Sequence, residues 1–471
     1  MISTRAAGRP GCRLPLAATL LALLPGLAHG DLEWKVTPVI SADLIYEFNP
    51  DGVPDESPEP KDDAYISATY AKLNFVGRGQ DSLYEIEPSV RFRESWANDS
   101  NRQLDGRDYG LRASSAWLLE NTRFALYGSY SRLPSRDTDY PIANPNTEQV
   151  SGGGLGCTEE IAIQGRCTVD ERQDHWYIQP ELSRSITPLL AWDANANLSR
   201  TSYSEAEITG RLDYDYYAIG SGLTRIFAER HQLYVRGSFS YFNSEQPVSA
   251  VEDDERYRFN NRTYNEGIQV GYFYSFSPQL TFSANAGASF SQVRFSGLET
   301  LNGLPCLTDN DEDGFDSVPC TLRSDDTNFV GNVILRRQIG DRISAQLNAG
   351  REIQPGGDGA QVVSDIFGAH LDREFSTKLR GSVSLLYSSQ TALGARTEGV
   401  LRRRFDRDYL NAATSINWKF VRDFELQIQF SYQLDKQKSP LDSETTFSLD
   451  KDNSVIVLSI RYSKAFLLNG F

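Results

Sequence analysis

The sequence has few histidines and, after its first thirty residues, no long apolar run. Beyond residue 30 no run of eighteen apolar residues occurs, which excludes membrane-spanning helices, since these need about 20 such residues. Three histidines follow that point, His175, His231 and His370, and none of them belongs to a nucleophile, metal or phosphate-binding motif. We therefore predict that the chain is not an enzyme; a hydrolase built on a Ser–His or Asp–His pair is the alternative.

The first thirty residues are typical of a secretory signal peptide. Three arginines open the segment, an apolar stretch at 14–27 is too short to span a membrane, and Ala28-His29-Gly30 has the small-x-small pattern of a cleavage site. We expect residues 1–30 to be removed. The mature domain, 31–471, then lies outside the cytoplasm.

Acidic residues outnumber basic ones by 63 to 47. Because the signal peptide holds three of the basic residues and no acidic one, the mature chain keeps 44 basic residues and has a formal net charge of −19. This balance argues against nucleic acid as a partner, since phosphate binding needs a basic surface. Two interpretations of the acidity stay open: simple solvation, or acidic external loops that recruit divalent cations.

The mature sequence is a succession of segments in which apolar and polar residues alternate. In the clearest, 424–434, every even position is apolar or aromatic and every odd position is polar. Side chains of a β-strand point alternately to opposite faces, so this strand has one apolar and one wet face. Seven more segments repeat the pattern, and they are longer than the about 5–6 residues usual for strands of soluble domains. The sequence therefore predicts an all-β fold, a closed transmembrane antiparallel β-barrel.

The connections between these segments alternate in length. Short turns lie near residues 78–82, 120–122, 187–188, 228–231, 277–278, 340–341, 375–377 and 421–423; long polar loops lie near residues 50–63, 98–107, 134–174, 204–213, 243–261, 297–326, 354–360, 392–406 and 436–452. Bacterial outer-membrane barrels use short periplasmic turns and longer external loops. Eight turns and nine loops join eighteen strands and place both termini in the periplasm. Because 65–77 and 362–370 alternate poorly, sixteen strands stay an alternative.

The last alternating segment and three prolines complete this picture. Ile456, Leu458, Ile460 and Tyr462 share one face near the C-terminus, and Phe466 or Phe471 supplies a final aromatic residue. We expect the outer-membrane assembly machinery to bind this strand, and lipid and lipopolysaccharide to surround the barrel. Proline donates no ladder hydrogen bond, so we expect local bulges at the three mid-strand prolines, which are Pro38, Pro88 and Pro180.

Four patterns between residues 91 and 246 carry a family resemblance. They are LDGRDY at Leu104–Tyr109, YSRLPSRDT at Tyr130–Thr138, WYIQPELSRSIT at Trp176–Thr187 and YDYYAIGSGL at Tyr214–Leu223. This third of the chain resembles the β-barrel porin type 2 family, whose members are often encoded beside exopolysaccharide gene clusters. The resemblance implies an outer-membrane barrel linked to envelope polysaccharide, and it supplies neither a substrate nor functional residues.

Cysteines are few, and four of the five lie in two long loops. Cys12 belongs to the signal peptide, Cys157 and Cys167 lie in the third loop, and Cys306 and Cys320 lie in the sixth. An even number in an oxidising compartment favours disulfides. We expect each pair to close within its own loop, which would remove roughly 3 kcal/mol of chain freedom from the unfolded state. Pairing between the two loops is the alternative.

The sixth loop also holds a run of acidic residues. Asp309, Asp311 and Asp313 occupy alternate positions before Gly314, as in the opening of a calcium loop. Cys320 stands where an EF-hand has its bidentate Glu, so the loop is not an EF-hand. We expect Ca²⁺ within 298–326, bound by these three residues and completed by Asp316 or a distant acid. A merely solvated acidic loop is the alternative.

The polar face of the predicted strands is where a transport function would lie. Six charged residues are predicted to face the lumen: Glu85, Glu87, Arg91, Arg93, Lys378 and Arg380. Opposed charges of this kind suit a polar conduit for sugars or small ions, although a generically solvated wall has the same composition. We predict a porin-like channel or an exopolysaccharide-associated barrel. The alternative is a structural barrel with a plugged lumen, into which part of the third loop could fold, and with external loops that bind partners or polysaccharide.

Overall fold

The computed structural model describes residues 33–48, 63–97, 106–134, 172–204, 213–246, 259–297, 307–310, 314–317, 320–355, 361–393, 406–438 and 448–468. No helix among these residues is long and apolar enough to cross a membrane. The strands are β1 (Glu33–Phe48), β2 (Asp63–Arg78), β3 (Ser82–Ala97), β4 (Gly106–Leu119), β5 (Thr122–Pro134), β6 (Arg172–Thr187), β7 (Leu190–Tyr203), β8 (Asp213–Ala228), β9 (His231–Gln246), β10 (Phe259–Ser277), β11 (Leu280–Gly297), β12 (Leu307–Asn310), β13 (Gly314–Ser317), β14 (Cys320–Ile339), β15 (Ile343–Pro355), β16 (Gln361–Ser376), β17 (Leu379–Ala392), β18 (Asp406–Val421), β19 (Phe424–Lys438), β20 (Ser448–Ser463) and β21 (Phe466–Leu468).

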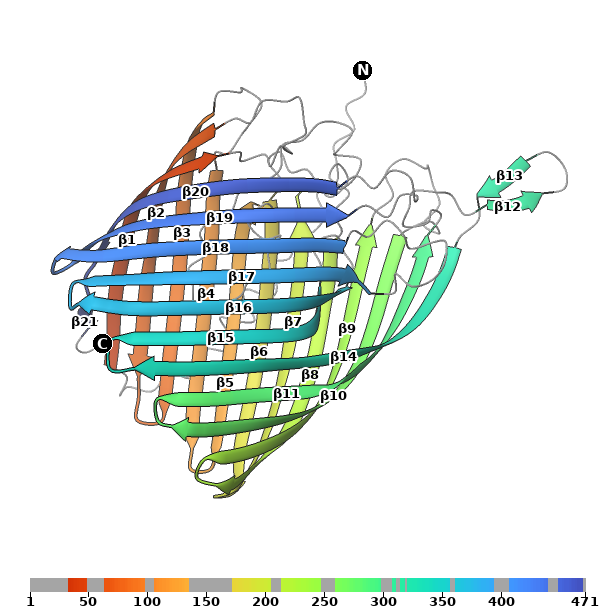
Figure 1. The fold of residues 1–471 in the computed structure, drawn as a ribbon, viewed down its shortest axis with the longest axis horizontal. Helices are drawn as coiled ribbons and strands as arrows, with labels where there is room; N and C mark the ends of the chain where they lie inside the picture. The colour runs from red at the N-terminus through yellow and green to blue at the C-terminus, as the bar shows by residue number, and fades with distance from the viewer. Residues whose placement is uncertain are drawn as a thin grey trace.

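Eighteen of these strands form one closed barrel. Each pairs antiparallel with its neighbours in the chain, and β1 pairs with both β2 and β20, which closes the sheet. In Figure 1 the red-to-yellow strands form the far wall and the green-to-blue strands cross in front of them. The short strands β12 and β13 pair only with each other, and β21 continues β20 along β1. The predicted fold of eighteen strands is confirmed, and the sixteen-stranded alternative is wrong.

The rhythm of short and long connections is also confirmed. The eight short connections have two or three residues each: 79–81, 120–121, 188–189, 229–230, 278–279, 340–342, 377–378 and 422–423. Gly340 has a φ of 58°, in the left-handed region that glycine adopts without a steric penalty. The first residues of β1 pair with the last residues of β2, beside the short turn 79–81, and β21 pairs with the same part of β1. Both ends of the described chain therefore lie at the short-turn end of the barrel.

Exposed apolar side chains concentrate on one face of the long strands. On β19, Phe424, Ile428 and Phe430 are 40%, 48% and 43% exposed, and all three are even-numbered as the alternation predicts. On the neighbouring β20, Ile456 and Ile460 are exposed in the same way. Such a belt would be unfavourable in water and is favourable against hydrocarbon, and closure of the barrel leaves the sheet without an edge strand.

The two segments with poor alternation are strands β2 and β16. Their pattern is blurred because apolar residues also occupy the polar face: Ala64, Ile66 and Ala68 on β2 and Val362 on β16 are buried. The register places Ile66 opposite Ile45 of β1, on the face away from the exposed Tyr65. Poor alternation here reflects apolar packing on the second face and does not mark a missing strand.

The expected bulges at the three prolines are wrong. Pairing stops for two residues beside Pro88 and beside Pro180, and the register resumes unshifted on the other side. Pairing also stops for two residues opposite Pro38, where β20 ends and β21 begins. The register is again unshifted, because β1 pairs with both strands in the same register. A missing donor therefore removes local pairing without adding a residue. The register shifts instead lie beside short turns, at Ser185/Thr187, Ile226/Ala228, Ser275/Ser277, Glu374/Ser376 and Trp418/Val421.

Candidate functional site in the barrel lumen

A contact between distant strands identifies the inner face of the barrel. Asn265 of β10 donates from Nδ2 to Oε1 of Gln361, the first residue of β16, at 2.6 Å. Three strands, β11, β14 and β15, separate these two along the wall, so the bond must cross the interior. Asn265 shares its face with the odd-numbered residues of β10, and the exposed Ile268 and Val270 lie on the opposite, outer face. Residues that pair in register on adjacent strands share a face, so the inner face of every other barrel strand follows from that of β10.

The same contact shows that the β15–β16 hairpin leans inward at its long-loop end. β14 pairs with β15 only from Gly331 to Ile339, whereas β15 and β16 stay paired out to Pro355 and Gln361. In Figure 1, β14 extends past the ends of both strands. Beyond Arg351 the hairpin therefore leaves β14 and lies inside the wall. Gln361 shares its face of β16 with the outward-facing Phe367 and Leu371, so the outer face of the hairpin end meets the inner face of β10. The hairpin end narrows the interior there.

The four lumen-facing residues predicted on β3 all lie on its inner face. Glu87 pairs with Lys72 of β2 at 3.1 Å, and Glu85 accepts a hydrogen bond from Asn74 Nδ2 at 2.8 Å. Arg93 forms an ion pair with Asp108 of β4 at 3.1 Å, and both side chains are at least 96% buried.

Arg91 lies near the Tyr70 ring, with Cζ 5.6 Å from the ring centroid. Each charge on this part of the wall therefore has a partner on an adjacent strand.

The two residues predicted near β17 are separated by the structure. Lys378 lies in the turn 377–378, not on a strand, and Arg380 is the second residue of β17. Arg380 forms an ion pair with Glu374 of β16, which it faces in register. Only Arg380 therefore projects from the lumen face of a strand.

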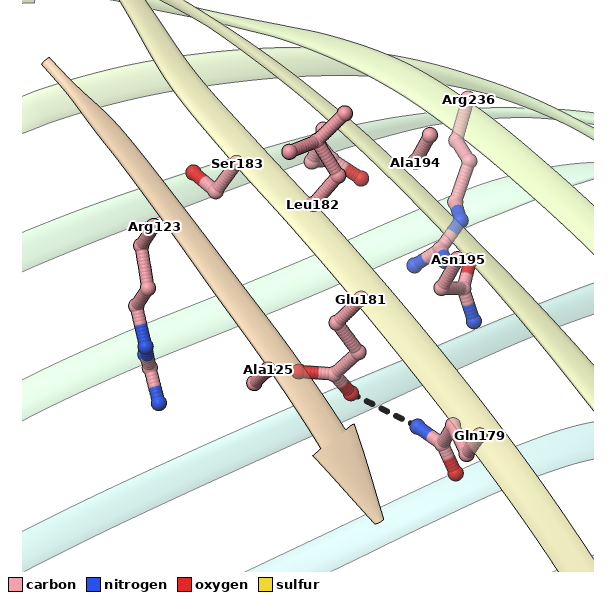
Figure 2. Close-up of a pocket in the computed structure, with 10 residues that line it drawn as sticks. Arg123, Ala125, Gln179, Glu181, Leu182, Ser183, Ala194, Asn195 and Arg236 are labelled. Atoms are coloured by element: carbon pink, nitrogen blue, oxygen red, sulfur yellow. Dashed lines mark hydrogen bonds between the residues drawn. The ribbon is translucent and has the colours of Figure 1, made fainter. Parts of the chain in front are cut away.

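A polar recess in the wall of β5–β9 was not predicted from the sequence. Its volume is about 300 Å³, and its charged residues are Arg123 of β5, Glu181 of β6, Asp193 of β7 and Arg236 of β9. Figure 2 shows Glu181 between the two arginines. Arg236 pairs in register with Gln269, on the same face of β10 as Asn265, so the recess opens on the lumen. Arg123 and Asp193 lie close to the first residues of their strands, toward the short turns.

Two glycines make room for the charged side chains of this recess. A Cβ at Gly220 would lie 2.9 Å from Asn195 Oδ1 and 3.1 Å from Arg236 Nε, and a Cβ at Gly222 would lie 3.1 Å from Asp193 Oδ1. The side chains of Asp193 and Asn195 on β7 and of Arg236 on β9 therefore lie close over the backbone of β8, which has no side chain at these two positions.

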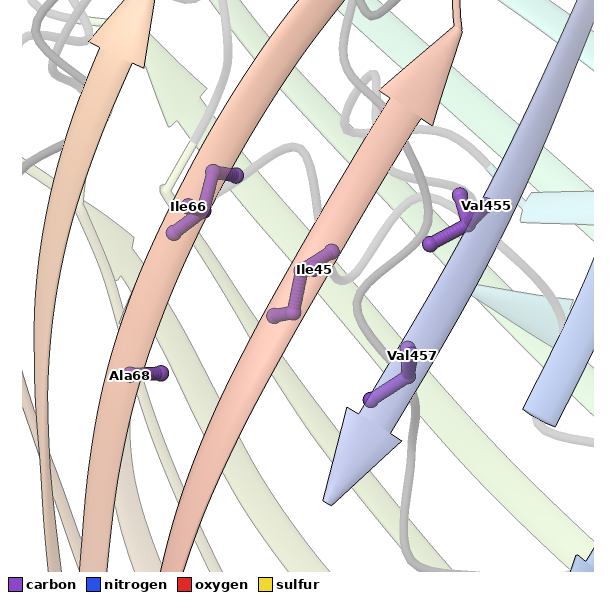
Figure 3. Packing of buried hydrophobic residues seen from close by; sticks show 5 residues of the cluster. All are labelled: Ile45, Ile66, Ala68, Val455 and Val457. Carbon is purple, nitrogen blue, oxygen red and sulfur yellow. The ribbon is translucent and has the colours of Figure 1, made fainter. Parts of the chain in front are cut away.

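An apolar cluster interrupts the polar lumen wall at the barrel seam. Ile45 of β1, Ile66 and Ala68 of β2, and Val455 and Val457 of β20 are all buried (Figure 3). Val455 has no exposed surface. Polar residues flank the cluster on the same face: Asn453 donates to Glu47 at 3.4 Å, and Ser459 donates to Asp43 at 2.5 Å.

One histidine on the lumen face has a carboxylate partner. His370 Nε2 lies 2.7 Å from Asp372 Oδ2, and the Ser344 hydroxyl donates to the same oxygen at 3.4 Å. The serine thus contacts the carboxylate and not the imidazole, an order unlike that of a nucleophilic triad. His175 contacts the Thr201 hydroxyl at 2.9 Å, and His231 contacts the Tyr272 hydroxyl at 2.6 Å beside a short turn.

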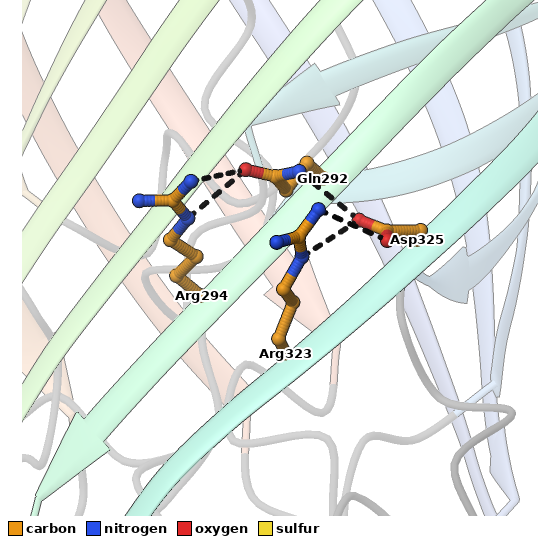
Figure 4. A network of polar contacts seen from close by, with 4 residues as sticks. All are labelled: Gln292, Arg294, Arg323 and Asp325. Atoms are coloured by element: carbon orange, nitrogen blue, oxygen red, sulfur yellow. Dashed lines mark hydrogen bonds and ion pairs between the residues drawn. The ribbon is translucent and has the colours of Figure 1, made fainter.

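Charged pairs form a band on the outer face, between the apolar belt and the long loops. We call it the outer ion-pair band; its pairs are Arg132–Asp174, Arg200–Asp215, Arg323–Asp325 and Arg351–Asp365, at 3.9, 3.8, 3.3 and 2.5 Å. In Figure 4, Gln292 joins two arginines through this band, because it accepts from Arg294 and donates to Asp325 at 3.2 Å. Tyr130 also donates to Asp174 at 2.8 Å.

The predicted calcium ligands and disulfides fall mostly outside the described residues. Asp309 lies on β12 and Asp316 on β13, in a two-stranded hairpin in which Asp309 pairs with Phe315. Cys320 is the first residue of β14. Asp311, Asp313, Cys157, Cys167 and Cys306 lie outside the residues that the structure describes, so the calcium site and both disulfides stay predictions.

Comparison with known proteins finds likeness only among solved structures. No family model and no curated protein sequence matches the chain. OccAB4 from Acinetobacter baumannii has a TM-score of 0.40 and 11% identity, over 93% of this chain and 99% of that one. OccK2 from Pseudomonas aeruginosa has a TM-score of 0.38 and 10% identity, over 91% of this chain and 98% of that one. The open form of the ferric-catecholate import receptor Fiu from E. coli has a TM-score of 0.43 and 9% identity, over 90% of this chain and 81% of that one.

The class of this protein follows from its own geometry. The strands close into a barrel, the outer face carries an apolar belt bounded by ion pairs, and the inner face carries charged and amide side chains. Those features together define a transmembrane β-barrel.

Proposed function

We propose that this chain is an outer-membrane channel of the porin kind that passes small polar solutes, including sugars, and is associated with exopolysaccharide. The observation that carries the proposal is the polar wall inside a closed barrel with an apolar outside. A wet interior of this composition lets hydrated solutes cross a layer of hydrocarbon that would otherwise exclude them. The exopolysaccharide association rests on the family resemblance alone.

A second function, a structural barrel with a plugged lumen, is favoured by two observations. The apolar seam cluster is buried although it lies on the lumen face, and the end of the β15–β16 hairpin lies inside the barrel, within hydrogen-bond distance of Asn265. Both would be expected of an interior without a continuous water path. Such a barrel would act through its external loops.

Current through planar bilayers separates the two functions. We expect the refolded chain to give discrete conductance steps, and we expect Arg380→Glu to shift the reversal potential in a KCl gradient toward cation selectivity. The matched control is Arg373→Glu, because Arg373 pairs in register with Gly381 beside Arg380 but lies on the outer face, over Phe375. A correctly refolded barrel without conductance steps would contradict the channel and support the plugged barrel.

We further propose how the barrel lies in its membrane. The outer ion-pair band suits the polar headgroups of lipopolysaccharide, where arginines can bind phosphate and tyrosines lie at the interface. This orientation puts the long loops outside the cell and both termini in the periplasm. It also leaves the C-terminal strand β20, which β21 continues from Phe466, available to the assembly machinery before closure.

A further inference from the structure

The recess in the wall of β5–β9 brings together equal numbers of opposite charges. Arg123 and Arg236 are cationic, and Glu181 and Asp193 are anionic. All four are described residues, and no ion pair forms between any two of them. Lys72 and Glu87, elsewhere on the wall, do form such a pair. The four charges of the recess line one space without pairing with one another.

Amide side chains bind two of the four charged groups, and a glycine leaves room for a third. Arg236 donates from Nη2 to Oδ1 of Asn195, and Gln179 donates to Oε1 of Glu181 at 2.7 Å (Figure 2). Gly222 leaves space for the Asp193 carboxylate on the lumen side of β8. Each amide satisfies part of its charged partner, and that partner, which lines the recess, keeps further donors or acceptors.

The charge pattern selects one class of ligand. A simple anion would be attracted by the arginines and repelled by Glu181 and Asp193, and a simple cation would meet the reverse. A neutral sugar would use the hydrogen-bonding groups but leave four charges without a counter-charge. A molecule that carries a carboxylate and an ammonium group can pair with both signs at once.

We propose that this recess binds a small zwitterion of amino-acid size, with the ligand carboxylate on the arginines and its ammonium on Glu181 and Asp193. The volume of about 300 Å³ is at the small end of the range for ligand sites, about 300–1,000 Å³. This binding proposal rests on the proposed channel function, because the recess would bind zwitterionic solutes transiently as they pass through the lumen. Affinity would be weak enough for the solute to leave.

The test compares three probes of matched shape on the purified full-length barrel in detergent. L-Alanine carries both groups; isobutyrate has a methyl in place of the ammonium, and isopropylamine has a methyl in place of the carboxylate. Saturation-transfer NMR titrations give an apparent Kd for each probe, and glucose serves as the neutral polyol. We expect L-alanine to bind about tenfold more tightly than either isostere, the effect of one charge-assisted hydrogen bond.

Two substitutions then locate the site. Glu181→Gln is expected to weaken L-alanine binding about tenfold with little effect on isobutyrate, and Arg236→Gln to weaken L-alanine and isobutyrate alike. If Arg236→Gln does not refold, Arg123→Gln takes its place. The matched control is Arg112→Gln, since Arg112 faces the lumen from β4, opposite Glu87 in register and outside the recess. Its Kd for L-alanine should equal that of the parent.

Three results would overturn the proposal: equal affinity for L-alanine and its isosteres, tighter binding of glucose, or an equal loss in Arg112→Gln. The bilayer experiment keeps this outcome separate from the channel function. A barrel that conducts without preferring L-alanine contradicts the recess alone. A barrel that binds L-alanine and gives no current contradicts the channel alone.

Discussion

At the Arg93–Asp108 pair, two full charges lie almost entirely out of water on adjacent strands. Breaking such a buried pair by removing one of its two charges typically costs 3–5 kcal/mol. We therefore expect Asp108→Asn to lower the free energy of unfolding by about 3 kcal/mol, measured by reversible urea unfolding in detergent. Asp365→Asn is the control, because the Arg351–Asp365 pair is about half exposed and should lose less than about 1 kcal/mol. Equal losses in the two variants would contradict this account of burial.

The residue scale also shows where sequence reasoning stops. Alternation alone puts Glu85, Glu87, Arg91 and Arg93 on one face, because a strand fixes the direction of its own side chains. It could not pair Arg93 with Asp108, since that depends on the register between two strands. The recess was missed for the same reason: Asn195 and Arg236 are 41 positions apart, and only the pairing of β7, β8 and β9 brings them together.

At the scale of elements, β12 and β13 give the acidic loop a backbone framework. Their hairpin brings Asp309 and Asp316 into neighbouring strands, and we propose that Asp311 and Asp313 complete a calcium site in a loop closed by a Cys306–Cys320 disulfide. Calorimetry on the full-length barrel should show calcium binding with a Kd of about 10⁻⁴–10⁻³ M, the range of weak extracellular sites. Asp311→Ala should abolish the heat, and Asp341→Ala, an acidic residue in a short turn, should preserve it. No heat in the parent at several millimolar calcium would mean that these acids are only solvated.

Elements were predicted well wherever their two faces meet different surroundings. Strand β19 alternates cleanly because one side meets the apolar exterior and the other a polar lumen. Strands β2 and β16 alternate poorly because Ile66 and Val362 are buried on the lumen side, a contact that no local pattern reports. The inward lean of the β15–β16 hairpin likewise depends on Gln361 reaching β10, across three intervening strands.

At the scale of the whole molecule, the central claim is a barrel with hydrocarbon outside and water inside. It is tested most directly by nitroxide scanning along β19, at positions 425–430, in the refolded barrel in lipid with the four cysteines beyond residue 30 replaced by serine. Even positions, which include the exposed Ile428 and Phe430, should collide with oxygen dissolved in the bilayer. Odd positions, such as Gln427 and Gln429, should collide with a water-soluble nickel reagent, so that the two profiles alternate with period two and opposite phase. Profiles in phase with each other, or equal access of the nickel reagent to both faces, would contradict the transmembrane barrel.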